Sequence, residues 1–146
     1  MNSYMSIGQN YIKKATKEEK DIFLSILCTL SAIDGHSSDS EIEFIEDIAK
    51  DIGVELKPAY FSIDENFCVH KASFISNRRL ALEIVKYMLA LSYTDNSFSD
   101  KEGNFICKIT EALNIEPQKV SEISSWVIDR IVWLEQAYLI FEENNE

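Results

Sequence analysis

The feature that most constrains the fold of this chain is an internal repeat. When the sequence is shifted by 61 positions, the stretch Leu30–Glu41 aligns with the stretch Leu91–Glu102. Nine positions are then identical within the window 27–54, more than helical periodicity alone produces. The identical positions are Leu30, Ser31, Asp34, Ser38, Asp39, Glu41, Phe44, Ile45 and Ile48. The chain is therefore expected to contain one structural unit twice.

Each copy of the repeat is predicted to fold as a helix, a short loop and a second helix. Apolar residues recur at helical spacing on both sides of the loop, and capping boxes precede three of the four helices. These boxes begin at Thr16, Ser38 and Ser99. Repeat one is expected to span about residues 16–54 and repeat two about residues 77–115.

The predicted helix ends support the alignment independently. Gly35 and Gly53 follow helices in repeat one, and the matching positions in repeat two hold Asn96 and Asn114. Glycine and asparagine are the residues that best tolerate the left-handed conformation at a helix C-terminus. Two matched exchanges of this kind indicate that helix ends are repeated as well as helix faces.

The remaining segments complete an all-α prediction. Between the repeats, residues 55–76 are expected to begin a short helix at Pro58 and to continue as a loop that holds Cys68 and His70. A long last helix is predicted over about residues 117–142, with a broad apolar arc that packs along both repeats. We therefore predict one all-α domain over residues 1–146, with about six to seven helices and a pseudo-twofold between the two hairpins.

Composition narrows the possible surroundings and partners. The net charge of −11 opposes binding to nucleic acid, which needs clustered Lys and Arg, and it favours a basic protein partner or a cation. No apolar run approaches the roughly 18 residues of a membrane span, and the first residues lack the pattern of a signal peptide. A cytoplasmic location is the resulting expectation.

The thiols and the tryptophans are interpreted as packing residues. Cys28, Cys68 and Cys107 are odd in number and form no close pair, so buried or half-buried reduced thiols are expected rather than a zinc or redox site. Trp126 and Trp133 lie seven residues apart on one helix face. Core packing is the expected role of this pair, and an exposed partner groove is the alternative.

Four carboxylates form the candidate site. Asp34 and Asp95 end the first helices, Glu41 and Glu102 begin the second helices, and each acid continues an apolar stripe and is expected to point inward. One interpretation is helix capping alone. The other is a site for Ca²⁺ or Mg²⁺, because both ions prefer carboxylate oxygens. The spacing excludes an EF-hand, whose last glutamate would fall at Ile45.

Catalytic motifs are weak in this sequence. There is no HExxH, no CxxC, no glycine-rich phosphate loop and no convincing Ser/His/Asp arrangement. His36 adjoins Asp34 and is interpreted as an exposed loop residue, with a metal-ligand role as the alternative. A metal-dependent hydrolase that uses the four acids remains the alternative function, and it requires an open cleft with an accessible metal.

The loop sequences resemble the paired A-x-D-G-x-x-S-x-x-E loops of the TerB-like family of helical domains. The resemblance rests on the stretch Ala32–Glu41 and its echo Thr94–Glu102, and it covers most of residues 16–125. Asn96 stands where the family has glycine, and Tyr93 and Thr94 replace the usual small residues, so repeat two departs further from the family pattern.

The TerB-like resemblance implies a fold and a role. It implies that metal is bound by the matching acids, Asp34, Glu41, Asp95 and Glu102. Together with the acidic surface and the weak catalytic motifs, it leads us to expect a non-catalytic interaction or scaffold module with a protein partner. The family resemblance would place such a module in a bacterial stress response related to tellurite resistance.

Overall fold

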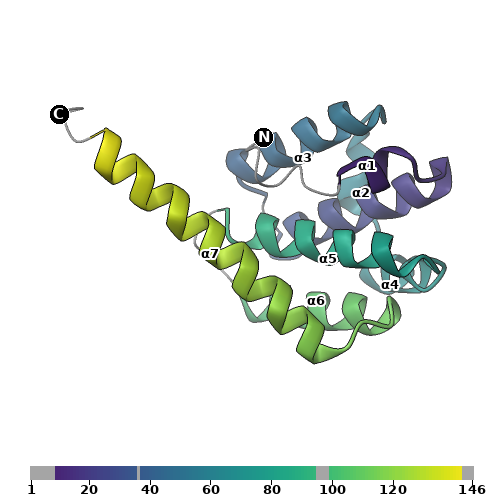
Figure 1. Ribbon diagram of the computed structural model, residues 1–146. Coiled ribbons are helices and arrows are strands. Elements are labelled where there is room, and N and C mark those ends of the chain that lie inside the picture. Colours follow the sequence, from purple (N-terminus) through teal and green to yellow (C-terminus); the bar gives the residue numbers. More distant parts are fainter. Residues whose placement is uncertain (1–8, 36, 95–98, 143–146) are drawn as a thin grey trace.

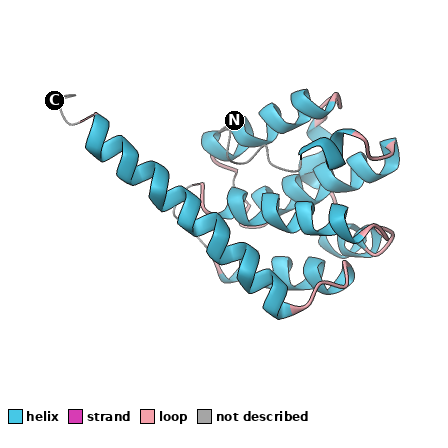
Figure 2. Cartoon of the chain, viewed as in Figure 1, coloured by secondary structure: helices cyan, strands magenta, loops and turns pink. Residues whose placement is uncertain are grey.

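The computed structural model describes residues 9–35, 37–94 and 99–142. These residues form seven α-helices and one short 3₁₀ helix, without a strand, so the all-α prediction is confirmed (Figure 2). The helices are α1 (Gln9–Lys13), α2 (Lys17–Ala32), α3 (Asp39–Ile52), η2 (Pro58–Ser62), α4 (Glu65–Ala72), α5 (Arg78–Ser92), α6 (Asp100–Ala112) and α7 (Pro117–Phe141).

The two predicted repeats correspond to the helix pairs α2–α3 and α5–α6. All three capping boxes are present, with the side chains of Thr16, Ser38 and Ser99 each accepting from the backbone N–H three residues later. Gly53 and Asn114 end the second helices at φ values of 74° and 61°, so the matched left-handed helix ends are confirmed there. Asn96 lies outside the described residues.

Helix α2 lies at the centre of the fold, in contact with α3, α5, η2 and α4 (Figure 1). Ten consecutive residues of α2, 22–31, are buried, because neighbouring helices cover most of its circumference. The first helices of the two repeats meet through Phe23 and Tyr87, whose rings pack edge to face with centroids 5.5 Å apart. One continuous apolar core therefore joins both repeats.

The segment between the repeats contains more helix than the sequence predicted. The short helix at Pro58 is confirmed as η2, but the expected loop around Cys68 and His70 is wrong, because those residues lie in α4. Asp64 caps α4 by accepting from the backbone N–H of Phe67, and Cys68 and Ala72 form its buried side. Its two buried residues are small, which explains the missed helical pattern.

Helix α7 differs most from expectation. It has the predicted length, but it packs chiefly on α5 instead of running along both repeats, and its second half projects away from the other helices (Figure 1). Its first half is held by the buried Val127 and by a 3.1 Å hydrogen bond between the hydroxyls of Ser124 and Tyr93. Arg78 and Glu116 form a bidentate ion pair beside its first turn.

Two residues expected in the core are exposed. Trp133 lies on the projecting half of α7 and is 60% exposed, so core packing of the Trp126 and Trp133 pair is wrong for its second member. Cys107 is exposed on α6, whereas Cys28 and Cys68 are buried as expected. In both cases the helical pattern predicts that the residue lies on a helix. It does not predict whether another part of the chain covers that residue.

Candidate functional site

The two repeats are in contact at the candidate site through one described residue from each. Ser99, the cap of α6, donates a 3.0 Å hydrogen bond from its hydroxyl to Oδ1 of Asp34, which follows α2. The two residues are 65 positions apart in the sequence. The cap of α6 in repeat two therefore contacts the end of α2 in repeat one, so these equivalent regions of the two repeats are also neighbours in space.

Two of the four predicted acids are buried at this junction. Glu41 is 8% exposed and Glu102 is 5% exposed, which confirms their inward placement. Each completes its capping box, with Oε1 accepting from the backbone N–H of Ser38 at 3.0 Å or of Ser99 at 3.1 Å. The inward placement predicted for Asp34 is wrong, since α2 ends at Ala32 and the helical projection does not extend beyond that end.

Asp34 and Glu41 act electrostatically on the buried Glu102. The pKa of Glu102 is raised, first because burial disfavours its charged form and further because Asp34 and Glu41 are negative. The hydrogen bonds from Ser99 oppose this change. Glu102 is consequently a buried carboxylate in a negative field, and a bound cation or a proton would stabilise it.

The described residues do not by themselves complete a metal site. No group of three His, Cys, Asp or Glu side chains converges closely enough to hold a metal ion within the described ranges. Asp95, the fourth predicted ligand, and His36, the neighbouring histidine, lie outside those ranges. Asp34 and Glu41 are close enough to Glu102 to raise its pKa, but the described residues form no completed coordination shell.

The raised pKa of Glu102 predicts a pH dependence of stability. An acid whose folded pKa exceeds its unfolded value stabilises the fold at pH below the unfolded pKa, and this contribution is lost as pH rises through the folded pKa. We expect wild type to lose stability relative to Glu102→Gln as pH rises from about 4 to 7. Urea unfolding of both proteins across this range measures the difference.

The control for this measurement removes one charge from a neighbouring exposed site. Glu43→Gln on α3 changes the net charge equally but lies in solvent. The prediction is wrong if Glu102→Gln and Glu43→Gln change the free energy of unfolding in parallel at every pH. In that case the burial of Glu102 does not alter how stability depends on pH.

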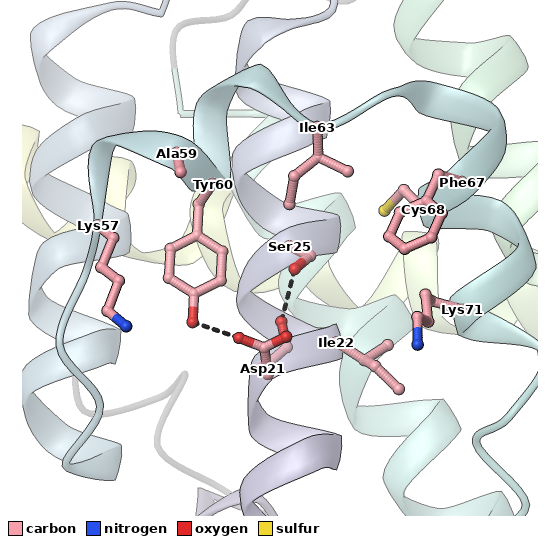
Figure 3. Close-up of a pocket in the computed structure, with 10 residues that line it drawn as sticks. All are labelled: Asp21, Ile22, Ser25, Lys57, Ala59, Tyr60, Ile63, Phe67, Cys68 and Lys71. Carbon is pink, nitrogen blue, oxygen red and sulfur yellow. Dashed lines mark hydrogen bonds between the residues drawn. The ribbon is translucent and has the colours of Figure 1, made fainter.

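A separate cavity of about 260 Å³ opens between α2, η2 and α4 (Figure 3). Its lining is mostly apolar, with Lys57 and Lys71 on opposite sides in this view and the hydroxyl of Tyr60 directed at Asp21. The lining residues are Asp21, Ile22, Ser25, Lys57, Ala59, Tyr60, Ile63, Phe67, Cys68 and Lys71. The cavity has room for a small apolar group.

The polar groups of this cavity are poorly suited to catalysis. Burial raises the pKa of the Cys68 thiol to about 11, which keeps it protonated and weakly nucleophilic near neutral pH. Burial and the hydrogen bond to Asp21 also raise the pKa of Tyr60. Cys28, buried nearby, has a pKa raised to about 12 by burial and then by Cys68. These groups fit a structural role.

A buried ion pair on α5 was not singled out from the sequence. Lys86 lies 2.6 Å from Glu83, both side chains are less than a tenth exposed, and Arg79 contacts the second oxygen of Glu83 at 2.8 Å. Burial lowers the pKa of Lys86, while the charge of Glu83 opposes that change. The available sequence signal is a pair of opposite charges, three residues apart, within the otherwise apolar run from Leu80 to Leu91.

Comparison with known proteins identifies no relative of this chain. No protein-family model, curated sequence or solved structure matches the chain. None of the helices in the described ranges has the length and apolar character needed to cross a membrane.

Proposed function

We propose that this chain is a non-catalytic, TerB-like interaction module whose two repeat loops are joined by a divalent cation, Ca²⁺ or Mg²⁺. The observation that supports it most directly is the contact between the loops, where Asp34 accepts from Ser99 beside the buried Glu102. Carboxylates that repel one another are stabilised when they share a divalent cation. Asp95 is the sequence equivalent of Asp34 and is the proposed fourth ligand.

Helix capping and cation binding are compatible in this arrangement. Glu41 and Glu102 each use Oε1 for the capping box. An ionised carboxylate has about four acceptor positions, so an oxygen can accept the cap hydrogen bond while the group also binds an ion. The caps would then hold the two glutamates in fixed orientations before the cation arrives, which lowers the entropy cost of binding.

The burial of the acids favours a binding role over the alternative of a metal-dependent hydrolase. A hydrolytic metal needs an open coordination position that substrate can reach. Glu41 and Glu102 are buried, and the cavity between α2, η2 and α4 is lined by other residues. Reproducible turnover of a substrate by the pure protein would contradict the non-catalytic proposal.

A thermal melt with and without cation tests the proposal. At a cation concentration a hundred times Kd, binding to the folded state should stabilise it by about 2.7 kcal/mol. Glu41→Gln with Glu102→Gln should abolish this gain, because glutamine keeps the carbonyl acceptor of the cap but removes the charge. Melting in EDTA and in millimolar Ca²⁺ or Mg²⁺ measures the effect.

The matched control removes two exposed acids from the same helices. Glu43→Gln with Glu111→Gln changes the net charge equally and should leave the cation response unchanged. If the melting temperature is the same in EDTA and in divalent cation, the carboxylates only cap the helices and the cation proposal is wrong.

The biological setting of the proposal comes from the TerB-like loops. We place the module in a bacterial stress response related to tellurite resistance, in the cytoplasm and with a protein partner. The acidic net charge of −11 favours a partner with a basic surface. A partner recovered from native extract with wild type, and lost with the Glu41→Gln and Glu102→Gln double variant, would connect the loops to partner binding.

A further inference from the structure

The second half of α7 exposes apolar side chains that the rest of the chain does not cover. We call the residues 131–141 the distal half of α7, and this stretch contains a single charged residue, Glu135. Within it Trp133 is 60% exposed and Phe141 is 81% exposed. The other exposed apolar residues of this half are Val132, Tyr138, Leu139 and Ile140. A helix that is apolar around most of its circumference is normally buried.

The apolar stripe of the first half continues into the distal half. Val127 is fully buried and Ile131 still packs partly against the core, and Leu134 and Tyr138 then follow at the same alternating spacing of three and four residues. The stripe ends at Phe141. This is the spacing of a helix that packs against another helix along its whole length. Figure 1 shows that α5 accompanies only the first half.

We propose that the distal half of α7 pairs with the same segment of a second copy of this chain, in antiparallel orientation. A twofold axis near Gln136 would place Leu134 of each copy opposite Tyr138 of the other, and Ile131 opposite Phe141. The contact would be isologous, so it closes after two copies and leaves no free face for further addition.

The distal half exposes a large apolar area for a segment of one helix. Trp133, Tyr138 and Phe141 together expose on the order of 400 Å², since an aromatic side chain offers roughly 150–250 Å². Val132, Leu139 and Ile140 expose further apolar surface on the flanks of the same helix. An uncovered patch of this size is at the upper limit for a monomer.

Charge selects the antiparallel orientation. Arg130 lies at the base of the distal half, with its guanidinium over the ring of Trp126, and Glu142 follows the last residue of the helix. In an antiparallel pair, Glu142 and the negative end of the helix dipole of one copy approach Arg130 of the other. In a parallel pair, like charges would face each other at both ends.

A lipid surface fits the segment less well. At about 1.5 Å per residue the distal half is roughly 16 Å long, about half the thickness of a bilayer core. The net charge of −11 also repels anionic lipid. A second copy covers the same apolar surface along its whole length, and the pairing of Arg130 with Glu142 offsets part of the repulsion between two acidic chains.

Molecular mass in solution tests the dimer. We expect sedimentation equilibrium in EDTA to give twice the chain mass of 16.8 kDa at micromolar concentration. Tyr138→Glu with Phe141→Glu should weaken dimerisation at least a hundredfold and give a monomer with unchanged helix content. The control Phe67→Glu makes the same kind of substitution at one exposed aromatic of α4 and should remain dimeric.

A charge exchange tests the orientation. Arg130→Glu should raise the dimer Kd several-fold, as expected for a charge at an interface rim. Adding Glu142→Arg should restore the wild-type Kd in the antiparallel arrangement. In a parallel pair like charges face each other in every variant, so neither substitution would change the Kd. If the second substitution weakens the dimer further, the proposed orientation is wrong.

The remaining outcomes contradict the proposal. A wild-type monomer at 100 µM overturns it, and equal effects of the α7 variant and of Phe67→Glu assign dimerisation to another surface. A wild-type monomer that floats with neutral vesicles, when the α7 double variant does not, shows that lipid is the occupant. The proposal does not rest on the cation site, because the mass is measured in EDTA and the cation response can be repeated with the monomeric variant.

Discussion

Replacing Lys86 by methionine is expected to lower the free energy of unfolding by about 3 kcal/mol. The methionine fills a similar volume, but it leaves the buried Glu83 with Arg79 as its cationic neighbour on the same helix. A buried carboxylate that loses its close counter-ion retains its desolvation cost without the compensating attraction. Urea unfolding at pH 7 measures the change.

The double variant Glu83→Leu with Lys86→Met should recover most of this loss. It removes both charges together, and an apolar pair of similar volume is usually no less stable than a buried ion pair. Arg79→Ala is the matched control, because this partner of Glu83 is 46% exposed and should cost less than about 1 kcal/mol. If Lys86→Met lowers the free energy of unfolding no more than Arg79→Ala does, the buried ion pair is no more important for stability than the exposed one.

Replacing Phe23 by alanine is expected to cost about 3–5 kcal/mol. Phe23 is fully buried on α2 and packs edge to face on Tyr87 of α5, so its removal opens a cavity at the contact between the repeats. The loss combines transfer of the ring, cavity formation and the aromatic pair itself. Chemical denaturation with two spectroscopic probes measures both the cost and its cooperativity.

Phe67→Ala provides the comparison for this prediction. Phe67 is an exposed aromatic residue of α4, 53% accessible, so truncation should change the free energy of unfolding by much less than Phe23→Ala. Similar costs for the two variants would mean that the contact between α2 and α5 does not hold the repeats together.

The parts of the fold that the sequence predicts correctly are those set by local chemistry. Capping boxes and left-handed helix ends involve residues within a few positions of one another, so Ser38, Ser99, Gly53 and Asn114 identify the helix boundaries directly. The inward placement of Glu41 and Glu102 follows from the apolar stripe that each continues within its own helix. These features are confirmed because no distant contact is needed to produce them.

The parts that the sequence does not predict depend on which surfaces meet. Helix periodicity finds the apolar residues of α7 but not the end of the surface beneath them, so Trp133 was assigned to the core. The hydrogen bond from Ser99 to Asp34 joins residues from different repeats, and the alignment relates these loops without indicating that they touch. Helix α4 was missed because its buried residues, Cys68 and Ala72, are small.

Phe23 and Tyr87, which pack together between the repeats, each have an equivalent residue in the other repeat under the shift of 61 positions. Phe23 corresponds to Ile84 and Tyr87 to Ile26, and all four side chains are fully buried. A single hairpin with this face would need a second molecule to cover it, at a free energy that depends on its concentration. Tethering two hairpins in one chain replaces that concentration by a constant effective molarity. It also frees the equivalent positions to diverge, so that one now carries an aromatic ring where the other carries isoleucine.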